Sequence, residues 1–237
     1  MIEYIIVLVV ILLFIFSSCK SEKFTNNMYM PIYIVSIPIR KASRLVPLLA
    51  RIKKDPRYQV REVFGVVGKD VVQTIEPFLN HGQIGCFMSH YGIWKKIVED
   101  TGQMQMALIL EDDAMINLPE MYDTIQEVID NLPDNWDVCY LGGTYHDKKG
   151  SYNVYKNILK SDTSLIWHSH AYLIRKRAAI RLVHMSKSVL DKKHIRDYNA
   201  ILPLDDWMTH PERGLNVYKV EPELVKFGWD GVSDTSK

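Results

Sequence analysis

Three consecutive carboxylates, Glu111, Asp112 and Asp113, directly follow the apolar run Met106–Leu110. Such a run is typical of a buried strand, and ligands of open α/β sheets lie beyond the carboxyl ends of the strands. Adjacent anions repel each other, so they are held together at low cost only where positive charge neutralises them. A divalent cation with oxygen ligands would do this and would also hold a phosphate. The triplet therefore predicts a metal site for a phosphorylated substrate, with the acidic start of a helix as the alternative.

The elements that would position these acids alternate between strand and helix. Strands are expected at 32–37, 58–67, 106–111, 136–141 and 165–174, and helices at 42–53, 81–100, 119–132 and 176–185. The first strand, helix and strand lie within about 40 residues, which is the unit of a parallel sheet. The pattern predicts an α/β layered fold.

Composition and charge fit a single globular domain of 237 residues, or one domain with an appendage. The net charge is +1 and the basic residues are scattered, so the sequence shows no nucleic-acid footprint. The cysteines Cys19, Cys86 and Cys139 are odd in number and widely spaced. They form neither a disulfide framework nor a metal-ligand spacing, and the last two are expected to be buried small apolar residues.

The N-terminus carries an unbroken apolar run from Tyr4 to Phe16. The run is shorter than the roughly 20 residues of a full span, and its n-region holds only Glu3 where a cleaved signal peptide carries basic residues. Lys20 and Lys23 follow the run and favour a cytosolic C-terminal side, with a signal-anchor and luminal domain as the alternative. We expect a hydrophobic membrane anchor or signal segment at 1–19, a polar linker at 20–29 and a globular domain at 30–237. The protein would be membrane-associated, single-pass or signal-anchored, on a side that the sequence leaves open.

Several stretches occur in the order found in a known family. His81–Trp94 has the pattern Gly-x-x-Gly-Cys-x-x-Ser-His-x-x-x-Trp, and Leu108–Ala114 is an apolar strand ending in Glu-Asp-Asp. Further matching stretches are Ile32–Ile37 with Arg44, Ser169–Ile174, Pro203–Met208, and Glu221–Val225 with Gly231–Asp234. Together they resemble glycosyltransferase family 25, the lipooligosaccharide and collagen galactosyltransferase group, over nearly all of the chain from Met30. The chain departs from the family at Val67, where members usually have Asp, and at Arg175, where they often have Ser or Thr.

The resemblance implies a GT-A-like nucleotide-sugar-binding fold with a mixed, mainly parallel sheet flanked by helices. It also implies a metal-dependent glycosyltransferase that moves a hexose, galactose from UDP-galactose or else glucose from UDP-glucose, with inversion. The implied acceptor is a glycan, a glycolipid or the hydroxylysine of a collagen-like protein, so the implied role is in glycan biosynthesis. Mn²⁺ or Mg²⁺ is the expected cofactor.

Sugar transfer needs a neutralised leaving diphosphate and a deprotonated acceptor hydroxyl. By the resemblance, Asp113 is the direct metal ligand and Glu111 its partner across Asp112, unless one of the three binds the ribose. The base is assigned to Asp206 ahead of Asp205, with Trp207 offering an apolar face to the sugar ring. The alternative for this second pair is the acidic first turn of a helix, which is compatible with the catalytic role.

Other polar side chains have weaker assignments. Arg44, Ser89 and His90 are expected to contact the donor, and Arg40 is a further diphosphate contact. The alternatives are exposed helix charges for the two arginines and a buried histidine satisfied by backbone for His90. His170 is expected to pack in or near the site. His210 is expected to be a surface histidine, and the alternative is that it serves as an extra metal ligand.

Two other functions are considered. A non-catalytic nucleotide-sugar or glycan-binding protein of the same fold is left open by the departures at Val67 and Arg175, although both carboxylate clusters argue against it. A metal-dependent phosphohydrolase would need an aspartate nucleophile or a histidine-rich two-metal cluster, and the sequence shows neither at usable spacing.

Overall fold

The computed structural model describes residues 30–71, 79–116, 121–147, 149–190 and 202–228. The expected anchor at 1–19 and the linker at 20–29 lie outside these ranges. Within them, no helix is both long enough and apolar enough to cross a membrane.

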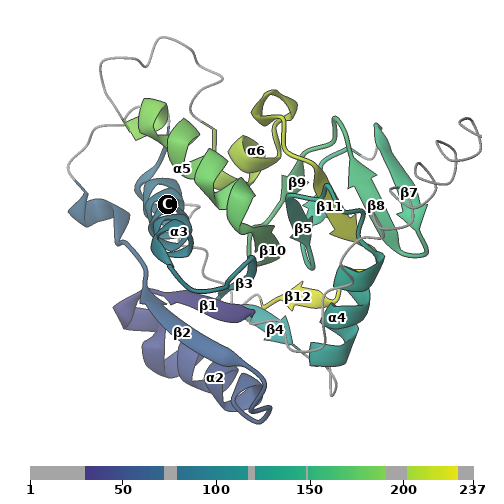
Figure 1. Ribbon diagram of the computed structural model, residues 1–237. Coiled ribbons are helices and arrows are strands. Elements are labelled where there is room, and N and C mark those ends of the chain that lie inside the picture. Colours follow the sequence, from purple (N-terminus) through teal and green to yellow (C-terminus); the bar gives the residue numbers. More distant parts are fainter. Residues whose placement is uncertain (1–29, 72–78, 117–120, 148, 191–201, 229–237) are drawn as a thin grey trace, which may run out of the picture.

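An eight-stranded mixed sheet forms the centre of the fold, in the order β2-β1-β3-β10-β5-β11-β8-β7 (Figure 1). Its strands are β1 (Pro31–Ser36), β2 (Gln59–Phe64), β3 (Met106–Glu111), β5 (Val138–Tyr140), β7 (Ser151–Tyr155), β8 (Ile158–Ser161), β10 (Ala171–Arg175) and β11 (Val217–Val220). β1 is parallel to β2 and β3, and β5 is parallel to β11, whereas β10 and β8 are antiparallel to both of their neighbours. All strands except β10 and β8 therefore point the same way. This confirms the expected mixed, mainly parallel sheet.

Helices cover both faces of the sheet (Figure 1). They are α2 (Val46–Ile52) and α4 (Met121–Asn131) on one face, and α3 (His81–Glu99), α5 (Lys176–Leu190) and α6 (Leu204–Thr209) on the other. The two-residue period of a strand explains the division. In β1, Ile32 and Ile34 belong to the core beneath α2 and α4, while Tyr33 and Val35 belong to the core beneath α3 and α5. The α/β layering expected from the sequence is confirmed.

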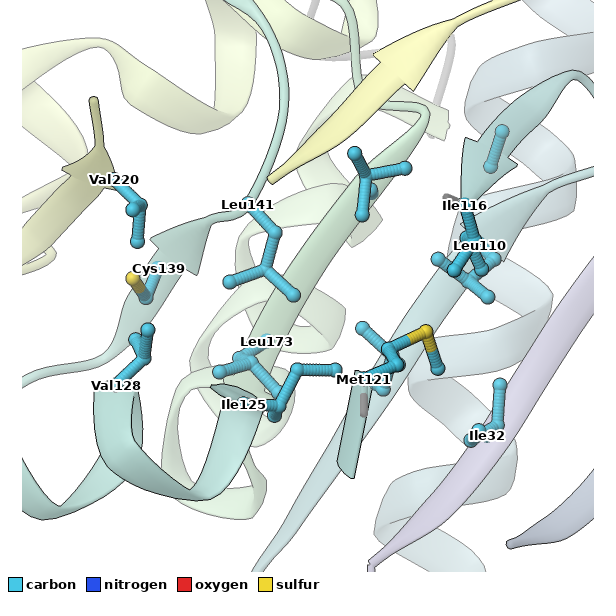
Figure 2. Packing of buried hydrophobic residues seen from close by; sticks show 14 of the residues in the cluster. Ile32, Leu110, Ile116, Met121, Ile125, Val128, Cys139, Leu141, Leu173 and Val220 are labelled. Carbon is cyan, nitrogen blue, oxygen red and sulfur yellow. The ribbon is translucent and has the colours of Figure 1, made fainter. Parts of the chain in front are cut away.

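The core beneath α4 is mainly aliphatic (Figure 2). Met121, Ile125 and Val128 of α4 pack in one cluster with Leu110 of β3 and Leu173 of β10, and all five are buried. Full burial of such a side chain contributes roughly 1.5–3 kcal/mol. The three residues of α4 belong to the buried face of the helix expected at 119–132, and their cluster packs α4 against the sheet that contains β3.

The core on the opposite face is rich in aromatic rings. The Trp207 ring of α6 lies 5.2 Å from that of Phe87 and 6.2 Å from that of Trp94, between ring centroids. Trp207 is fully buried, so the expectation that it offers a face to a sugar ring is wrong. The residue instead fixes α6, and with it the two aspartates of its first turn, against α3.

The strand expected at 165–174 is broken. It divides into β9 (Ile166–Trp167), which pairs with β6 (Thr144–Tyr145), and β10 of the central sheet. Between them His168 has a φ of 71°, a left-handed conformation that is uncommon for a residue with a Cβ. The break turns several side chains toward the carboxyl end of β3.

A small two-stranded sheet brings the C-terminal part of the described chain to the carboxyl end of β3. β4 (Ala114–Ile116), which directly follows the acidic triplet, pairs with β12 (Val225–Phe227). The Gly228 N–H then donates to the Asp113 carbonyl over 2.8 Å. The backbone around the triplet is therefore fixed from both sides.

Asp137 anchors the other end of the sheet, away from the triplet. It is 2% exposed and accepts from Arg177 Nε and from the Asn216 N–H, each over 2.9 Å. Asp137→Ala would leave these donors unpaired, so we expect the free energy of unfolding to fall by about 2–4 kcal/mol in urea denaturation. The exposed Asp134, changed to Ala, should alter it by no more than about 0.5 kcal/mol. A loss below about 1 kcal/mol for Asp137→Ala would contradict this role.

Candidate active site

A cavity of about 670 Å³ contains both carboxylate clusters in its wall. The acidic triplet lies at the carboxyl end of β3, and Asp205 and Asp206 face the same space from the first turn of α6. The wall also includes Arg44, Ser89 and His90. The structure thus brings together every residue that the sequence singled out for donor, metal or base chemistry, apart from Arg40 and His210.

Glu111 is held by two neighbours. The Ser169 hydroxyl donates to its Oε1 over 2.6 Å, and His90 Nε2 lies 3.3 Å from the same oxygen. Burial raises the pKa of Glu111, but His90 and Ser169 outweigh burial and bring the pKa to about 2. Glu111 is therefore ionised at neutral pH, and its second oxygen is left for a ligand.

Asp112 and Asp113 share the guanidinium of Arg44. Arg44 Nη1 lies 3.6 Å from Asp112 Oδ1 and 3.5 Å from Asp113 Oδ2. Arg44 belongs to η2 (Lys41–Leu45), a π-helical turn just after β1, and such turns are frequent at functional sites. The arginine is only 11% exposed, so it is not the exposed helix charge considered as an alternative. Asp112 also accepts a hydrogen bond from the Ser36 hydroxyl.

The acids carry more negative charge than the protein neutralises. Burial raises the pKa of Asp113 to about 8, and the charges of Glu111 and Asp112 add to the effect. Asp113 Oδ1 is buried without a hydrogen-bond partner in the described part of the chain. A buried oxygen of this kind needs a donor or a cation, and carboxylate oxygens suit Mg²⁺ or Mn²⁺. The residues present therefore fit a hard divalent ion bound by Asp113.

The position of His90 is fixed by the start of α3 and by a contact with the central sheet. Asn80 caps the helix through a capping box with Gln83, which fixes where its first turn begins. Ten residues on, His90 Nδ1 lies 2.8 Å from the Tyr172 hydroxyl of β10. The alternative of a histidine satisfied by backbone does not hold, because both ring nitrogens face side chains.

Ser89 lines the cavity, where its expected contact with the donor stays a prediction, and its hydroxyl also has a structural role. Its hydroxyl donates to the Gly85 carbonyl over 2.6 Å and accepts from the Val66 N–H over 2.7 Å. These bonds fix the loop after β2 against α3. The approach is close, since a Cβ on Gly68 would lie 1.6 Å from the His81 carbonyl oxygen. Ser89 therefore shapes the cavity wall by positioning this loop.

The two aspartates of α6 have different surroundings. Asp205 accepts from the His168 N–H over 2.9 Å and from the Asp206 N–H over 3.1 Å, so both of its oxygens bind backbone. Among the described residues, Asp206 Oδ1 accepts from Trp167 Nε1 over 3.0 Å and Oδ2 is left for another partner. Burial, followed by the charge of Asp205, raises the pKa of Asp206. Asp206 is the better placed of the two to accept a proton, and the helix-start interpretation of the pair also holds.

Two aromatic residues that the sequence pattern does not mark as functional, Trp167 and His168, form an aromatic wall beside Asp206. Trp167 is 41% exposed, and its ring centroid lies 4.6 Å from that of His146. The His168 ring stacks on Phe227 at 5.4 Å and 12°. Trp167, and not the buried tryptophan of α6, presents an exposed aromatic ring in the cavity wall. The regular strand pattern of this segment gave no sign of the turn that exposes it.

The remaining histidines lie as expected. His170 lines the cavity, where its Nε2 donates to the Val225 carbonyl over 2.9 Å, and burial lowers its pKa. His210 is outside the cavity wall and accepts from the Glu212 N–H, which caps a short 3₁₀ turn. The interpretation of His210 as a surface residue is therefore favoured.

The two departures from the family pattern lie in different places. Val67 lines the cavity. Arg175 is at the far end of β10, where its guanidinium lies 4.9 Å from the ring centroid of Trp136. Only the departure at Val67 can therefore touch a ligand in this cavity.

Known proteins resemble this chain in sequence. Residues 71–208 match the family model described as Glycosyltransferase family 25 (LPS biosynthesis protein). The chain is 28% identical over 159 residues to procollagen galactosyltransferase 1 of Danio rerio, covering 62% of this chain and 25% of the relative. It is 33% identical over 66 residues to inactive glycosyltransferase 25 family member 3 of Homo sapiens, covering 27% of this chain and 11% of the relative. The chain thus spans about a quarter or less of the length of these relatives.

A solved structure shares the fold. The glycosyltransferase involved in the glycosylation of the major capsid of PBCV-1 superposes with a TM-score of 0.50 at 13% identity, covering 86% of this chain and 94% of that one. This likeness bears on the fold, which is GT-A-like as expected. The family model covers more than half of the sequence, and the chain belongs to glycosyltransferase family 25.

Proposed function

We propose that this chain is a metal-dependent hexosyltransferase that transfers galactose from UDP-galactose, with inversion, to a glycan, a glycolipid or hydroxylysine. The observation that carries the proposal is that one cavity holds both acids suited to a cation and a separate aspartate with an oxygen left for another partner. The galactosyltransferase name of a relative supports galactose as the sugar.

The β3 acids would serve the donor. Asp113 and Glu111 would hold Mn²⁺ or Mg²⁺, which when bound neutralises the leaving diphosphate as a Lewis acid. Arg44 adds a fixed positive charge beside the same acids, and Asp112 keeps the guanidinium in place through its 3.6 Å contact. His90 and Ser169 hold Glu111 in its charged form.

The α6 acids and the aromatic wall would serve the acceptor. Trp167 packs against the acceptor ring and brings its hydroxyl to Asp206. As the acceptor oxygen bonds to the anomeric carbon, its proton passes to Asp206 Oδ2 and the bond from that carbon to the diphosphate oxygen breaks. Attack from the face opposite the diphosphate inverts the anomeric centre in one displacement. Asp205 keeps the 167–169 turn in place through the His168 N–H.

Membrane attachment through residues 1–19 is part of the proposal. The apolar run from Tyr4 to Phe16 motivates it. The full-length protein should sediment with membranes after an alkaline wash, and a double variant carrying Leu8→Lys and Leu12→Lys should be released, because charged side chains within an apolar segment oppose its insertion. A full-length protein that leaves the membrane at this step would contradict the proposal.

Release of UDP tests the activity directly. Full-length protein would be incubated with Mn²⁺ and UDP-galactose, UDP-glucose or UDP-N-acetylglucosamine, with and without galactosyl acceptors or a hydroxylysine peptide. We expect release from UDP-galactose that rises with acceptor and stops with EDTA. Binding of UDP-galactose without any release would favour the non-catalytic alternative, to which the inactive human family member draws attention. Phosphate release from simple phosphoesters would favour a hydrolase.

Removing the exposed aromatic ring of Trp167 should weaken acceptor binding more than donor binding. We expect Trp167→Ala to raise the KM for acceptor about ten-fold or more, because the stacking surface beside Asp206 is lost, with little change in the KM for donor. Tyr155→Ala is the control, because this tyrosine is similarly exposed at 40% but lies on β7, outside the cavity wall. An equal effect of both variants on the acceptor would contradict the role of Trp167.

A further inference from the structure

A second group of metal-binding atoms lies in the same cavity wall. Cys86 Sγ, His90 Nε2 and a carboxylate oxygen of Glu111 all lie within 4.8 Å of one another. Cys86 and His90 are one turn apart on α3, and Glu111 ends β3, so two well-packed elements fix the group. The reaction proposed above gives no task to Cys86.

The distance between His90 and Glu111 matches that of a tetrahedral zinc site, and Cys86 Sγ lies within 4.8 Å of a ligand atom of each. Ligand atoms bound to one zinc ion are roughly 3.3–3.8 Å apart, and His90 Nε2 is 3.3 Å from Glu111 Oε1. This Nε2 is buried and has no hydrogen-bond partner of good geometry in the described part of the chain. His90 Nδ1 lies 2.8 Å from the Tyr172 hydroxyl, which also accepts from Trp94 Nε1 over 3.1 Å. A metal at Nε2 would replace the contact with Glu111 of the metal-free protein and leave the ring proton on Nδ1, facing this hydroxyl.

We propose that Cys86, His90 and Glu111 form a second metal site, selective for thiophilic divalent ions such as Zn²⁺. On binding, the Cys86 thiol releases its proton to solvent and a sulfur–zinc bond forms, while His90 Nε2 and Glu111 donate lone pairs. Water from the cavity completes four ligands. The sulfur and imidazole ligands favour zinc over Mg²⁺ and Mn²⁺, whereas the all-oxygen set at Asp113 has the opposite preference.

Zinc at this site would inhibit sugar transfer. Glu111 is the partner of Asp113 in holding the activating cation, and a zinc ion beside Cys86 would withdraw it. This consequence rests on the proposed function, but occupation of the site does not. Direct binding measurements therefore separate the failure of one from the failure of the other.

Cobalt provides the direct probe, because a cysteine thiolate bound to Co²⁺ gives a near-ultraviolet charge-transfer band. The full-length protein would carry Cys19→Ser in every sample. We expect one equivalent of Co²⁺ to give the band and Zn²⁺ to abolish it. Cys86→Ser should remove the band and weaken zinc binding about ten-fold or more. Cys139→Ser is the matched control, since Cys139 is fully buried in the core beneath α4, and this variant should behave like the parent.

The second measurement is zinc inhibition of UDP release at saturating Mn²⁺, expressed for each variant relative to its own zinc-free rate. The zinc concentration for half inhibition should rise about ten-fold or more in Cys86→Ser and stay unchanged in Cys139→Ser. A cobalt band that survives in Cys86→Ser, or is missing from the parent, would overturn the site. Cys86→Ala and circular dichroism guard against a folding defect, because a folded alanine variant must also lose the band.

Discussion

Asp113→Asn is expected to abolish metal-dependent sugar transfer while stabilising the metal-free protein above neutral pH. The carboxylate is the metal ligand proposed here, so its loss should lower turnover by about 10³-fold or more. In the metal-free protein the same carboxylate destabilises the folded state, because it is buried beside two other acids and its Oδ1 has no partner among the described residues. Asparagine removes the charge and keeps the shape.

The effect of Asp113→Asn on the free energy of unfolding depends on pH. The pKa of Asp113 rises from 3.8 to about 8 on folding, so between these values the folded protein holds a proton that the unfolded chain releases. The free energy of unfolding therefore falls as pH increases through this window. Asn cannot titrate. The free energy of unfolding of Asp113→Asn should therefore exceed that of the parent by an amount that grows from about pH 4, levels off above about pH 8 and reaches a few kcal/mol.

Urea denaturation in EDTA at about pH 5 and about pH 9 would measure the difference, alongside UDP release in Mn²⁺. Asp134→Asn is the control, because this exposed carboxylate should leave stability and turnover unchanged at both values of pH. If Asp113→Asn is less stable than the parent protein at the higher pH, or keeps Mn²⁺-dependent turnover, the assignment of Asp113 is wrong.

Asp206→Asn should remove catalysis and leave donor binding intact. Loss of a positioned general base lowers kcat by about 10²–10⁴-fold, and Asp206 belongs to α6, whereas the donor acids lie at the carboxyl end of β3. Asp205→Asn should lower kcat less, because Asp205 binds backbone N–H groups and an amide oxygen can replace one of these bonds. A kcat for Asp206→Asn above about one tenth of the parent value would contradict the assignment.

The pH profile separates a base from a structural carboxylate. Burial and the neighbouring Asp205 raise the pKa of Asp206 above 3.8, and only the ionised form accepts a proton. The value of kcat/KM should therefore fall on the acid side of the profile, with a midpoint above the pKa of an ordinary aspartate. The residual rate of Asp206→Asn should lack this step. A purely structural role would lower the rate without changing the profile.

The layered fold could be predicted because its signals are local. The apolar period of α4 and the run that forms β3 each reflect a face buried against the neighbouring layer. The acidic triplet at the end of β3 was recognisable for the same reason, since a buried strand that ends in charges must end at a sheet edge.

The proposed acceptor side could not be predicted, because contacts between distant segments create it. The 165–174 segment has the apolar pattern of one strand, yet it breaks at His168, where Asp205 accepts its N–H and Phe227 stacks on its ring. Trp207 was assigned to the sugar because it adjoins Asp206 in sequence. The helical turn instead buries it against Phe87, and Trp167 takes the exposed place.

Binding and turnover in the two aspartate variants test the division of the site most directly. Calorimetric titration of UDP-galactose, with Mn²⁺ and with EDTA, would be run beside UDP release with acceptor for the parent, Asp113→Asn and Asp206→Asn. We expect Mn²⁺-dependent binding in the parent and in Asp206→Asn, none in Asp113→Asn, and turnover in the parent alone. Metal-dependent donor binding that survives in Asp113→Asn, or is lost in a folded Asp206→Asn, would contradict the division of the site into a donor cluster on β3 and a base on α6.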